Sequence, residues 1–249
     1  MRAIRALSLC IAVFVSLCGS SSTAALAEDI ESLLSTFASE TDLARKEQLL
    51  NEIIKRSEAG SRLLLLAKTT RDTTTKWMAI RGIGFVKYRE AAPFLIKWLD
   101  HNHHWVRANA ARALGEIREK SASSALIRLL RRERDGGVIE QASLALRWIQ
   151  AKETIPVLKK AVFHKSDQTR CWVLQAIGDL GAEDDLSFLA KFLYNQSSSV
   201  EMCAANAIEA ITKEDFGFPE RSGPMNPQIG VNRAREWWKV NKSKYMRNK

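Results

Sequence analysis

The feature that most constrains the fold of this chain is a repeat of about 31 residues in its middle. Five segments of the form VRANAARALGEI align with one another, and consecutive segments start 31 or 32 residues apart, at Thr75, Val106, Val138, Thr169 and Val200. One aligned column holds only small residues, which are Gly82, Ala113, Ala145, Ala176 and Ala207. The next column holds only isoleucine or leucine. A period of 20 to 50 residues is typical of a solenoid.

A second segment recurs at the same period and reads AAPFLIKWL, SSALIRLL, IPVLKKAV and LSFLAKFL. Its apolar residues are three and four positions apart, which indicates an amphipathic helix. Pro93 and Pro156 fall where the first helical turn is expected, a position that tolerates proline. Because one helix pair cannot bury its apolar face alone, such units stack. The sequence therefore predicts an all-α fold, an α-solenoid of stacked antiparallel helix pairs.

The segment VRANAARALGEIREKSASSALIRLL resembles the HEAT-like repeat, also called the PBS-lyase HEAT-like repeat. The resemblance implies repeats over residues 75–212, preceded by one or two degenerate helical repeats over 28–74. Residues 213–249 are expected to form a loop and a C-terminal capping helix. The bilin lyases that gave the repeat its name need pigment-binding partners, and no residue pattern here points to a pigment.

Residues 1–27 have the layout of a secretory signal peptide. Arg2 and Arg5 are followed by an apolar run over residues 6–17 and by Ala25-Leu26-Ala27, a cleavage pattern. An uncleaved anchor is disfavoured because the apolar run is shorter than the roughly 20 residues of a membrane span. We expect cleavage after Ala27 and export to the periplasm or the extracellular space.

Positive charge is in excess and is partly ordered by the repeat. Without Arg2 and Arg5 the chain has 36 basic and 28 acidic residues, which favours an acidic partner; nucleic acid is not expected outside the cell. Three cations share one column of the second segment, and Arg131, Arg132 and Arg134 extend it locally. The candidate binding surface is Lys97, Arg128, Arg131, Arg132 and Lys159. The alternative is that an outward position simply favours long polar side chains.

His101, His103 and His104 are weak candidates for metal ligands, because they lie close together in one stretch. A structural zinc site needs four ligands, which one loop seldom supplies, so we predict no metal and no cofactor. Deoxyhypusine hydroxylase, a metal-dependent relative of such repeats, uses His-Glu pairs, and no His-Glu dipeptide occurs here. The common nucleophile, phosphate-binding and zinc-protease motifs are also missing, so we predict that the chain is not an enzyme.

Cys171 and Cys203 are 32 residues apart, one position out of step with the repeat. The axes of packed helices lie roughly 8–10 Å apart, whereas a disulfide needs Cα atoms within about 7 Å. Two separate small core residues are therefore predicted, with a bridge as the alternative.

These observations lead to a non-catalytic protein-protein interaction scaffold outside the cytoplasm as the first hypothesis. The second is a basic solenoid that binds an anionic membrane or cell-wall polymer. A metal-binding or enzymatic role through the loop of His101, His103 and His104 is the third.

Overall fold

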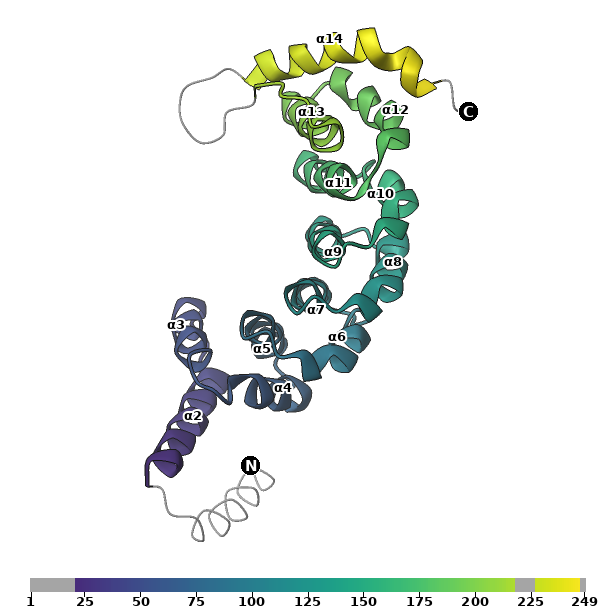
Figure 1. Cartoon of the computed structure of the whole chain (residues 1–249). Helices are drawn as coiled ribbons and strands as arrows, with labels where there is room; N and C mark the ends of the chain where they lie inside the picture. The colour runs from purple at the N-terminus through teal and green to yellow at the C-terminus, as the bar shows by residue number, and fades with distance from the viewer. Residues whose placement is uncertain (1–20, 218–226, 247–249) are drawn as a thin grey trace.

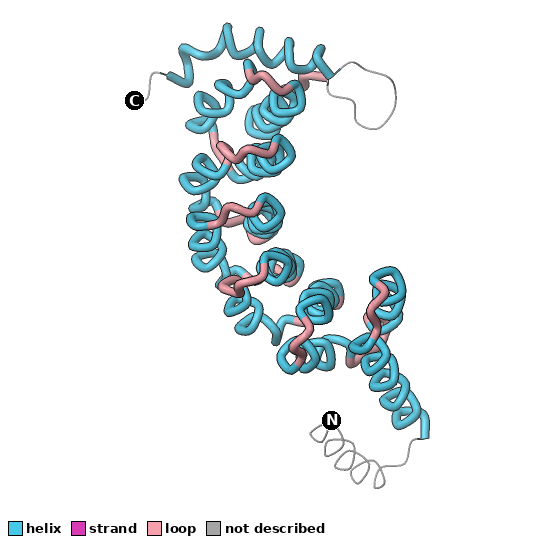
Figure 2. Tube along the Cα trace, turned by 180° about the vertical axis from the view of Figure 1, so that it is seen from behind, coloured by secondary structure: helices cyan, strands magenta, loops and turns pink. Residues whose placement is uncertain are grey.

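The computed structural model describes residues 21–217 and 227–246, and the side chains from Ile30 onward. The chain forms a curved stack of helices (Figure 1). Helices and loops account for all of the described residues, with no strand among them (Figure 2). The predicted all-α solenoid is therefore confirmed. Most of the predicted signal peptide lies outside the described residues, and its last residues belong to the first described helix, α2 (Ser21–Ser39).

Two rows of helices make up the arc (Figure 1). The inner row follows the concave side and consists of α5 (Thr73–Phe85), α7 (His104–Glu116), α9 (Gly136–Trp148), α11 (Asp167–Leu180) and α13 (Ser198–Thr212). The outer row consists of α4 (Ala59–Thr69), α6 (Ala92–Trp98), α8 (Ser123–Arg132), α10 (Ile155–Ala161) and α12 (Leu186–Leu189). Short 3-10 turns lead into the outer row at η1 (Arg89–Ala91), η2 (Lys120–Ala122), η3 (Lys152–Thr154) and η4 (Glu183–Asp185), and η5 (Ala190–Tyr194) extends α12. At the N-terminal end, α2 pairs with α3 (Leu43–Ile53).

Side-chain caps start the inner helices α5, α9 and α11. Asp72 accepts a hydrogen bond from the backbone N–H of Thr75, and Asp135 accepts one from Val138. These bonds satisfy amide groups that have no partner inside the helix. The polar loops before α5 and α9 therefore fix where these two helices begin.

Small residues set the distance between neighbouring inner helices. A Cβ atom built on Gly115 would lie 2.7 Å from the Cα of Ala145, and one built on Gly178 would lie 2.7 Å from the Cα of Ala207. Both contacts are far inside van der Waals distance, so the helices pack backbone against backbone there. Ala145 and Ala207 belong to the small column of the repeat, and this contact is the physical reason for that column.

Cys171 and Cys203 form a disulfide, with a Cα–Cα distance of 5.3 Å. The prediction of two separate core cysteines is wrong. It used the usual spacing of helix axes, but α11 and α13 approach more closely because Gly178 contacts Ala207. The two last inner helices are therefore covalently joined.

Helix α14 (Pro227–Met246) lies across the C-terminal end of the stack (Figure 1). Val231 and Ala234 are buried, and Trp237 packs against Phe216 with ring centroids 6.0 Å apart. Arg235 donates a hydrogen bond of 2.8 Å to the carbonyl of Leu193. The helix thus covers the apolar end of the last repeat. Within the described residues, none of the helices has the length and apolarity needed to cross a membrane.

Candidate functional site

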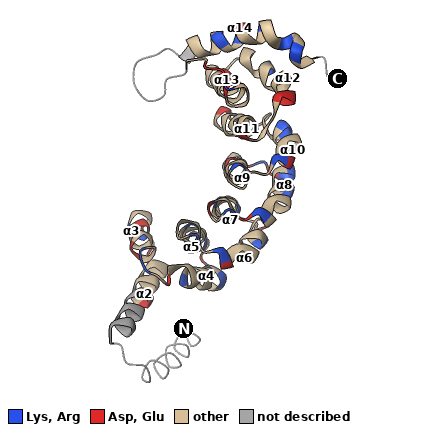
Figure 3. Cartoon of the chain, viewed as in Figure 1, with Lys and Arg blue, Asp and Glu red and all other residues tan. Residues whose placement is uncertain are grey.

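The predicted basic surface lies on the outer row, where Figure 3 shows lysine and arginine along α8 and α10. Lys97 on α6 and Arg128 on α8 are exposed. Lys159 on α10 is held by Asp185, with Nζ 2.5 Å from the carboxylate, and lies 5.3 Å from the ring centroid of Phe188. The column therefore exists, but the fold already neutralises one of its members.

The two residues that extend the column have different surroundings. Arg132 forms an ion pair with Asp100 and donates a hydrogen bond of 3.1 Å to the carbonyl of Leu99. Arg131 lies at a groove between α8 and α10, which is treated separately below. The five predicted residues thus do not form one continuous free surface.

The histidine loop is a helix-entry turn. The Nδ1 atom of His101 accepts a hydrogen bond of 3.1 Å from the backbone of His103, which is the N-cap residue of α7. The rings of His103 and His104 stack with centroids 4.9 Å apart. Burial lowers the pKa of His101, and the nearby cations Lys76, His103 and Arg107 lower it further. In the part of the chain that the structure describes, no group of three or more His, Cys, Asp or Glu residues could hold a metal ion.

A different cluster, which the sequence did not single out, lies on the inner row. We call it the inner stripe, and it consists of Trp77, Arg81 and Phe85 on α5 with Trp105 and Arg112 on α7. The three residues of α5 are four positions apart and so share one side of the helix. Trp105 is 52% exposed and Phe85 is 39% exposed, which is unusual for large apolar side chains. Because α4 covers the outer side of α5, this stripe faces the inner curve of the arc.

Aromatic rings and guanidinium groups alternate along the inner stripe. The ring centroids of Trp77 and Trp105 are 5.7 Å apart. Arg81 lies 5.5 Å from the ring of Trp77 and 5.8 Å from that of Phe85. Arg112 lies 5.6 Å from the ring centroid of Phe85, which completes an unbroken chain of contacts. Such cation-π contacts hold flat groups in a fixed arrangement.

Carboxylates orient both arginines of the inner stripe. Arg81 forms an ion pair with Glu47 of α3, and Arg112 pairs with Glu116 at 2.8 Å. Gly84 makes room for Glu116, because a Cβ atom at this position would collide with the carboxylate. The stripe therefore offers aromatic faces together with two guanidinium groups whose partners a bound carboxylate could replace. This arrangement suits a flat, conjugated, anionic molecule.

The sequence reasoning missed the inner stripe because it searched for columns. Trp77, Phe85 and Trp105 occupy different positions within the repeat, so alignment of the repeats scatters them. The available signal was local, namely the spacing of four residues between Trp77, Arg81 and Phe85.

These features define the class of protein as a helical-repeat solenoid with an aromatic and cationic inner surface. The family model for HEAT repeats matches residues 61–147, a span that contains the whole inner stripe. The chain is a HEAT-like repeat protein, as its sequence predicted.

Two curated relatives are similar to part of the chain. Phycocyanobilin lyase subunit alpha of Nostoc sp. strain PCC 7120 is 31% identical over 138 residues, which is 55% of this chain and 42% of that protein. Bilin biosynthesis protein PecE of Mastigocladus laminosus is 29% identical over 109 residues, 44% of this chain and 40% of that protein. The chain thus matches about two fifths of the length of these relatives.

Solved structures share the fold. The complex of CpcE and CpcF of phycocyanin lyase from Nostoc sp. PCC7120 includes a chain with a TM-score of 0.55 and 19% identity, covering 84% of this chain and 94% of that one. An archaeal HEAT-like repeats protein from Thermococcus onnurineus NA1 has a TM-score of 0.51 and 14% identity, covering 85% and 97%. At these identities the likeness concerns the fold alone.

The comparisons correct two predictions. The expected non-catalytic scaffold is wrong, and so is the expectation that the chain is no enzyme, because the curated relatives are a lyase subunit and a bilin biosynthesis protein. The prediction rested on missing catalytic motifs. Short motifs identify active sites built on one turn or loop, whereas a solenoid distributes a site over several helices.

Proposed function

We propose that the chain is a subunit of an enzyme of the bilin-lyase type and that its inner stripe holds a linear tetrapyrrole or a similar flat, anionic substrate. The observation that carries the proposal is the 31% identity over 138 residues with phycocyanobilin lyase subunit alpha. The alternating rings and guanidinium groups of the inner stripe support it.

The chemistry of the substrate class matches the stripe. A linear tetrapyrrole is a conjugated chain of flat rings that carries carboxylate side chains. Trp105 and Phe85 offer exposed ring faces for stacking. Arg81 and Arg112 can each form charge-assisted hydrogen bonds with a carboxylate that takes the place of Glu47 or Glu116. In this role the chain binds and orients the substrate.

A protein partner and an exported location are part of the same proposal. The structural neighbour from Nostoc was solved as a complex of two different proteins, CpcE and CpcF, which supports a partner for this chain as well. The predicted signal peptide supports export. So does the disulfide between Cys171 and Cys203, because such bonds persist mainly in oxidising compartments.

The proposal is tested by titrating the purified protein with biliverdin, followed by the absorbance of the pigment and by quenching of tryptophan fluorescence. Trp105→Ala should weaken binding about 2- to 10-fold, from the energy of one aromatic contact. Arg112→Gln should weaken it about tenfold or more, because a charged hydrogen bond is lost.

Phe163→Ala is the matched control, since Phe163 is an exposed aromatic residue (71%) beside the outer-row helix α10. Its affinity for biliverdin should equal that of the unmodified protein. Absence of binding, or equal affinity in the Trp105 and Phe163 variants, would show that the inner stripe is not a tetrapyrrole site.

A further inference from the structure

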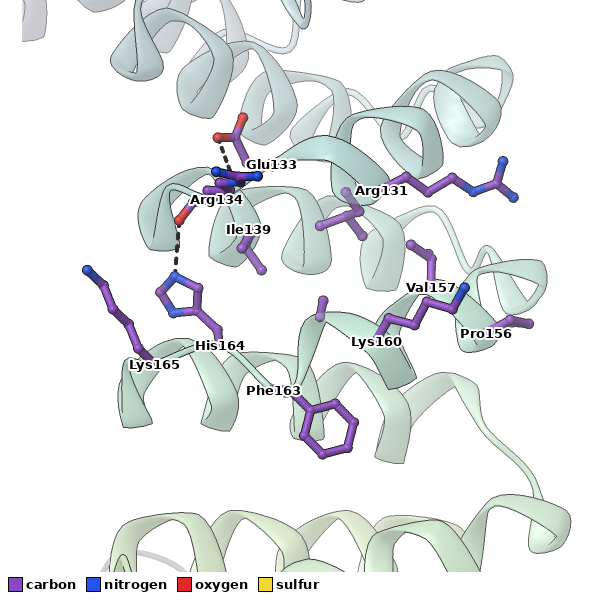
Figure 4. A pocket seen from close by; sticks show the side chains of 12 residues that line it. Arg131, Glu133, Arg134, Ile139, Pro156, Val157, Lys160, Phe163, His164 and Lys165 are labelled. Atoms are coloured by element: carbon purple, nitrogen blue, oxygen red, sulfur yellow. Dashed lines mark hydrogen bonds between the residues drawn. The ribbon is translucent and has the colours of Figure 1, made fainter.

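A separate groove lies on the outer row, between α8 and α10, and encloses about 800 Å³. Its inner surface is apolar and includes Leu130, Ile139, Val157 and Ala161. Phe163 borders the groove and is 71% exposed, and its ring points toward Phe188 and Phe192 of the next repeat, with ring centroids 6.3 and 5.8 Å away (Figure 4). Pockets of roughly 300–1,000 Å³ accommodate small ligands or a few side chains. The groove therefore has room for a short stretch of another chain.

Four cations surround this groove, namely Arg131, Arg134, Lys160 and Lys165. All four are exposed, and none of them forms an ion pair with the residues that the structure describes. They come from two different repeats, and Figure 4 shows Arg131 and Lys165 extending on opposite sides of the groove.

The one carboxylate of the groove does not neutralise these cations. The oxygens of Glu133 accept hydrogen bonds of 2.8 and 3.1 Å from Arg107 and of 3.0 and 3.1 Å from the backbone N–H groups of Arg134 and Asp135. Burial alone would raise the pKa of Glu133, but these hydrogen bonds outweigh it and hold the pKa below its ordinary value. Glu133 is thus ionised and already paired with Arg107.

His164 fixes the width of the groove. Its Nδ1 atom accepts a hydrogen bond of 3.1 Å from the backbone N–H of Ser166, so Nε2 carries the proton and donates to the carbonyl of Arg134 at 3.1 Å. This histidine links the loop after α8 to the loop after α10 (Figure 4). The two loops that carry Arg134 and Lys165 are therefore joined by a direct hydrogen bond.

We propose that this groove binds an acidic segment of a partner protein, with one apolar side chain in the hollow and carboxylates on the surrounding cations. Charge complementarity selects the acidic character, and the apolar surface beside Phe163 selects the anchor. A nucleic acid would need a continuous basic track along the outer row. Asp100 and Asp185 interrupt such a track by pairing with Arg132 and Lys159. The inference does not depend on tetrapyrrole binding, because the groove and the inner stripe lie on different rows.

The test uses fluorescence anisotropy with the intact protein and a labelled peptide of sequence EEDLEDE. The double variant Arg134→Glu with Lys160→Glu reverses two charges at the groove and should weaken peptide binding about tenfold or more. The matched control is Lys97→Glu with Arg128→Glu, which changes the net charge equally on exposed residues outside the groove. The control should change the affinity less than twofold.

Two further probes test the apolar contact and the preference for a peptide over a nucleic acid. Replacing the leucine of the peptide by serine should weaken binding about threefold or more, because the apolar contact is lost. A single-stranded DNA of equal charge should bind more weakly than the peptide. The proposal is overturned if the peptide does not bind, if both double variants lose affinity equally, if serine binds as well as leucine, or if the DNA binds as tightly.

Failure of this proposal and failure of the tetrapyrrole proposal give different results. Trp105→Ala should leave the peptide affinity unchanged, and the groove double variant should leave the biliverdin titration unchanged. Circular dichroism of each variant checks that the helices have formed.

Discussion

The disulfide between Cys171 and Cys203 closes a loop with a sequence separation of 32 residues, and this value fixes how much stability it adds. In the chain-entropy description, a cross-link of this length removes enough freedom from the unfolded chain to contribute about 3.7 kcal/mol at 25 °C. Replacing both cysteines by alanine should lower the free energy of unfolding by about that amount. For a chain of this size the melting temperature should fall by about 7–15 °C.

Urea unfolding followed by circular dichroism measures the effect, with and without a reducing agent. The reductant should destabilise the unmodified protein as much as the double substitution does, and it should have no effect on the double variant. Hydrogen exchange should show that lost protection is concentrated in α11 and α13, because neighbouring repeats support only one another. A difference below about 1 kcal/mol, together with no effect of reductant, would refute the reasoning.

Two other predictions concern the packing and the caps of the inner row. Gly178→Ala places a Cβ atom 2.7 Å from the Cα of Ala207, so it should lower the free energy of unfolding by about 1 kcal/mol or more in urea titrations, despite the better helix propensity of alanine. Gly137→Ala is its control, since a Cβ there would meet only the Asp135 carboxylate at 3.3 Å; equal losses in both variants would contradict the packing argument. Asp72→Ala removes a helix cap and should cost about 1 kcal/mol at pH 7. Burial raises the pKa of Asp72, but hydrogen bonds from Thr75 outweigh it and the net pKa is lowered from 3.8, so this stabilisation is present above pH 4 and is lost as the pH falls through the folded-state pKa. Melting temperatures of variant and parent should therefore converge in acid, and a constant difference down to pH 2 would contradict the cap.

The sequence predicted the fold because the same physical requirement recurs in every repeat. A small residue is needed wherever two inner helices touch, and an aliphatic residue is needed wherever the rows meet. The same residue type therefore recurs several times along the chain at each of these repeat positions. The disulfide was not predictable in the same way. The close contact of Gly178 with Ala207 repeats that of Gly115 with Ala145, but it is where α11 meets α13 that two cysteines lie within bonding distance.

The inner stripe and the groove were not predicted as sites, because the arrangement of their residues is not repeated along the chain. Residues of the proposed sites such as Trp105 and Phe163 do not recur at the repeat spacing. The cation column does not show which of its members are paired, since Lys159 forms an ion pair with Asp185, a residue of a different helix-entry turn, whereas Arg131 lies at the groove with no ion-pair partner among the described residues. Such pairings decide which cations remain free. A column of equivalent positions in the sequence does not reveal these pairings.

The two proposed sites lie on different rows of the solenoid. The inner stripe occupies α5 and α7 on the concave side, whereas the groove occupies α8 and α10 on the outer row. Arg107 of α7 pairs with Glu133, which in turn accepts a hydrogen bond from the backbone of Arg134 at the groove. The helix that carries Trp105 and the loop that carries Arg134 are therefore joined by direct bonds. Because the two surfaces lie on opposite rows, a substrate on the stripe leaves the groove open to a partner protein.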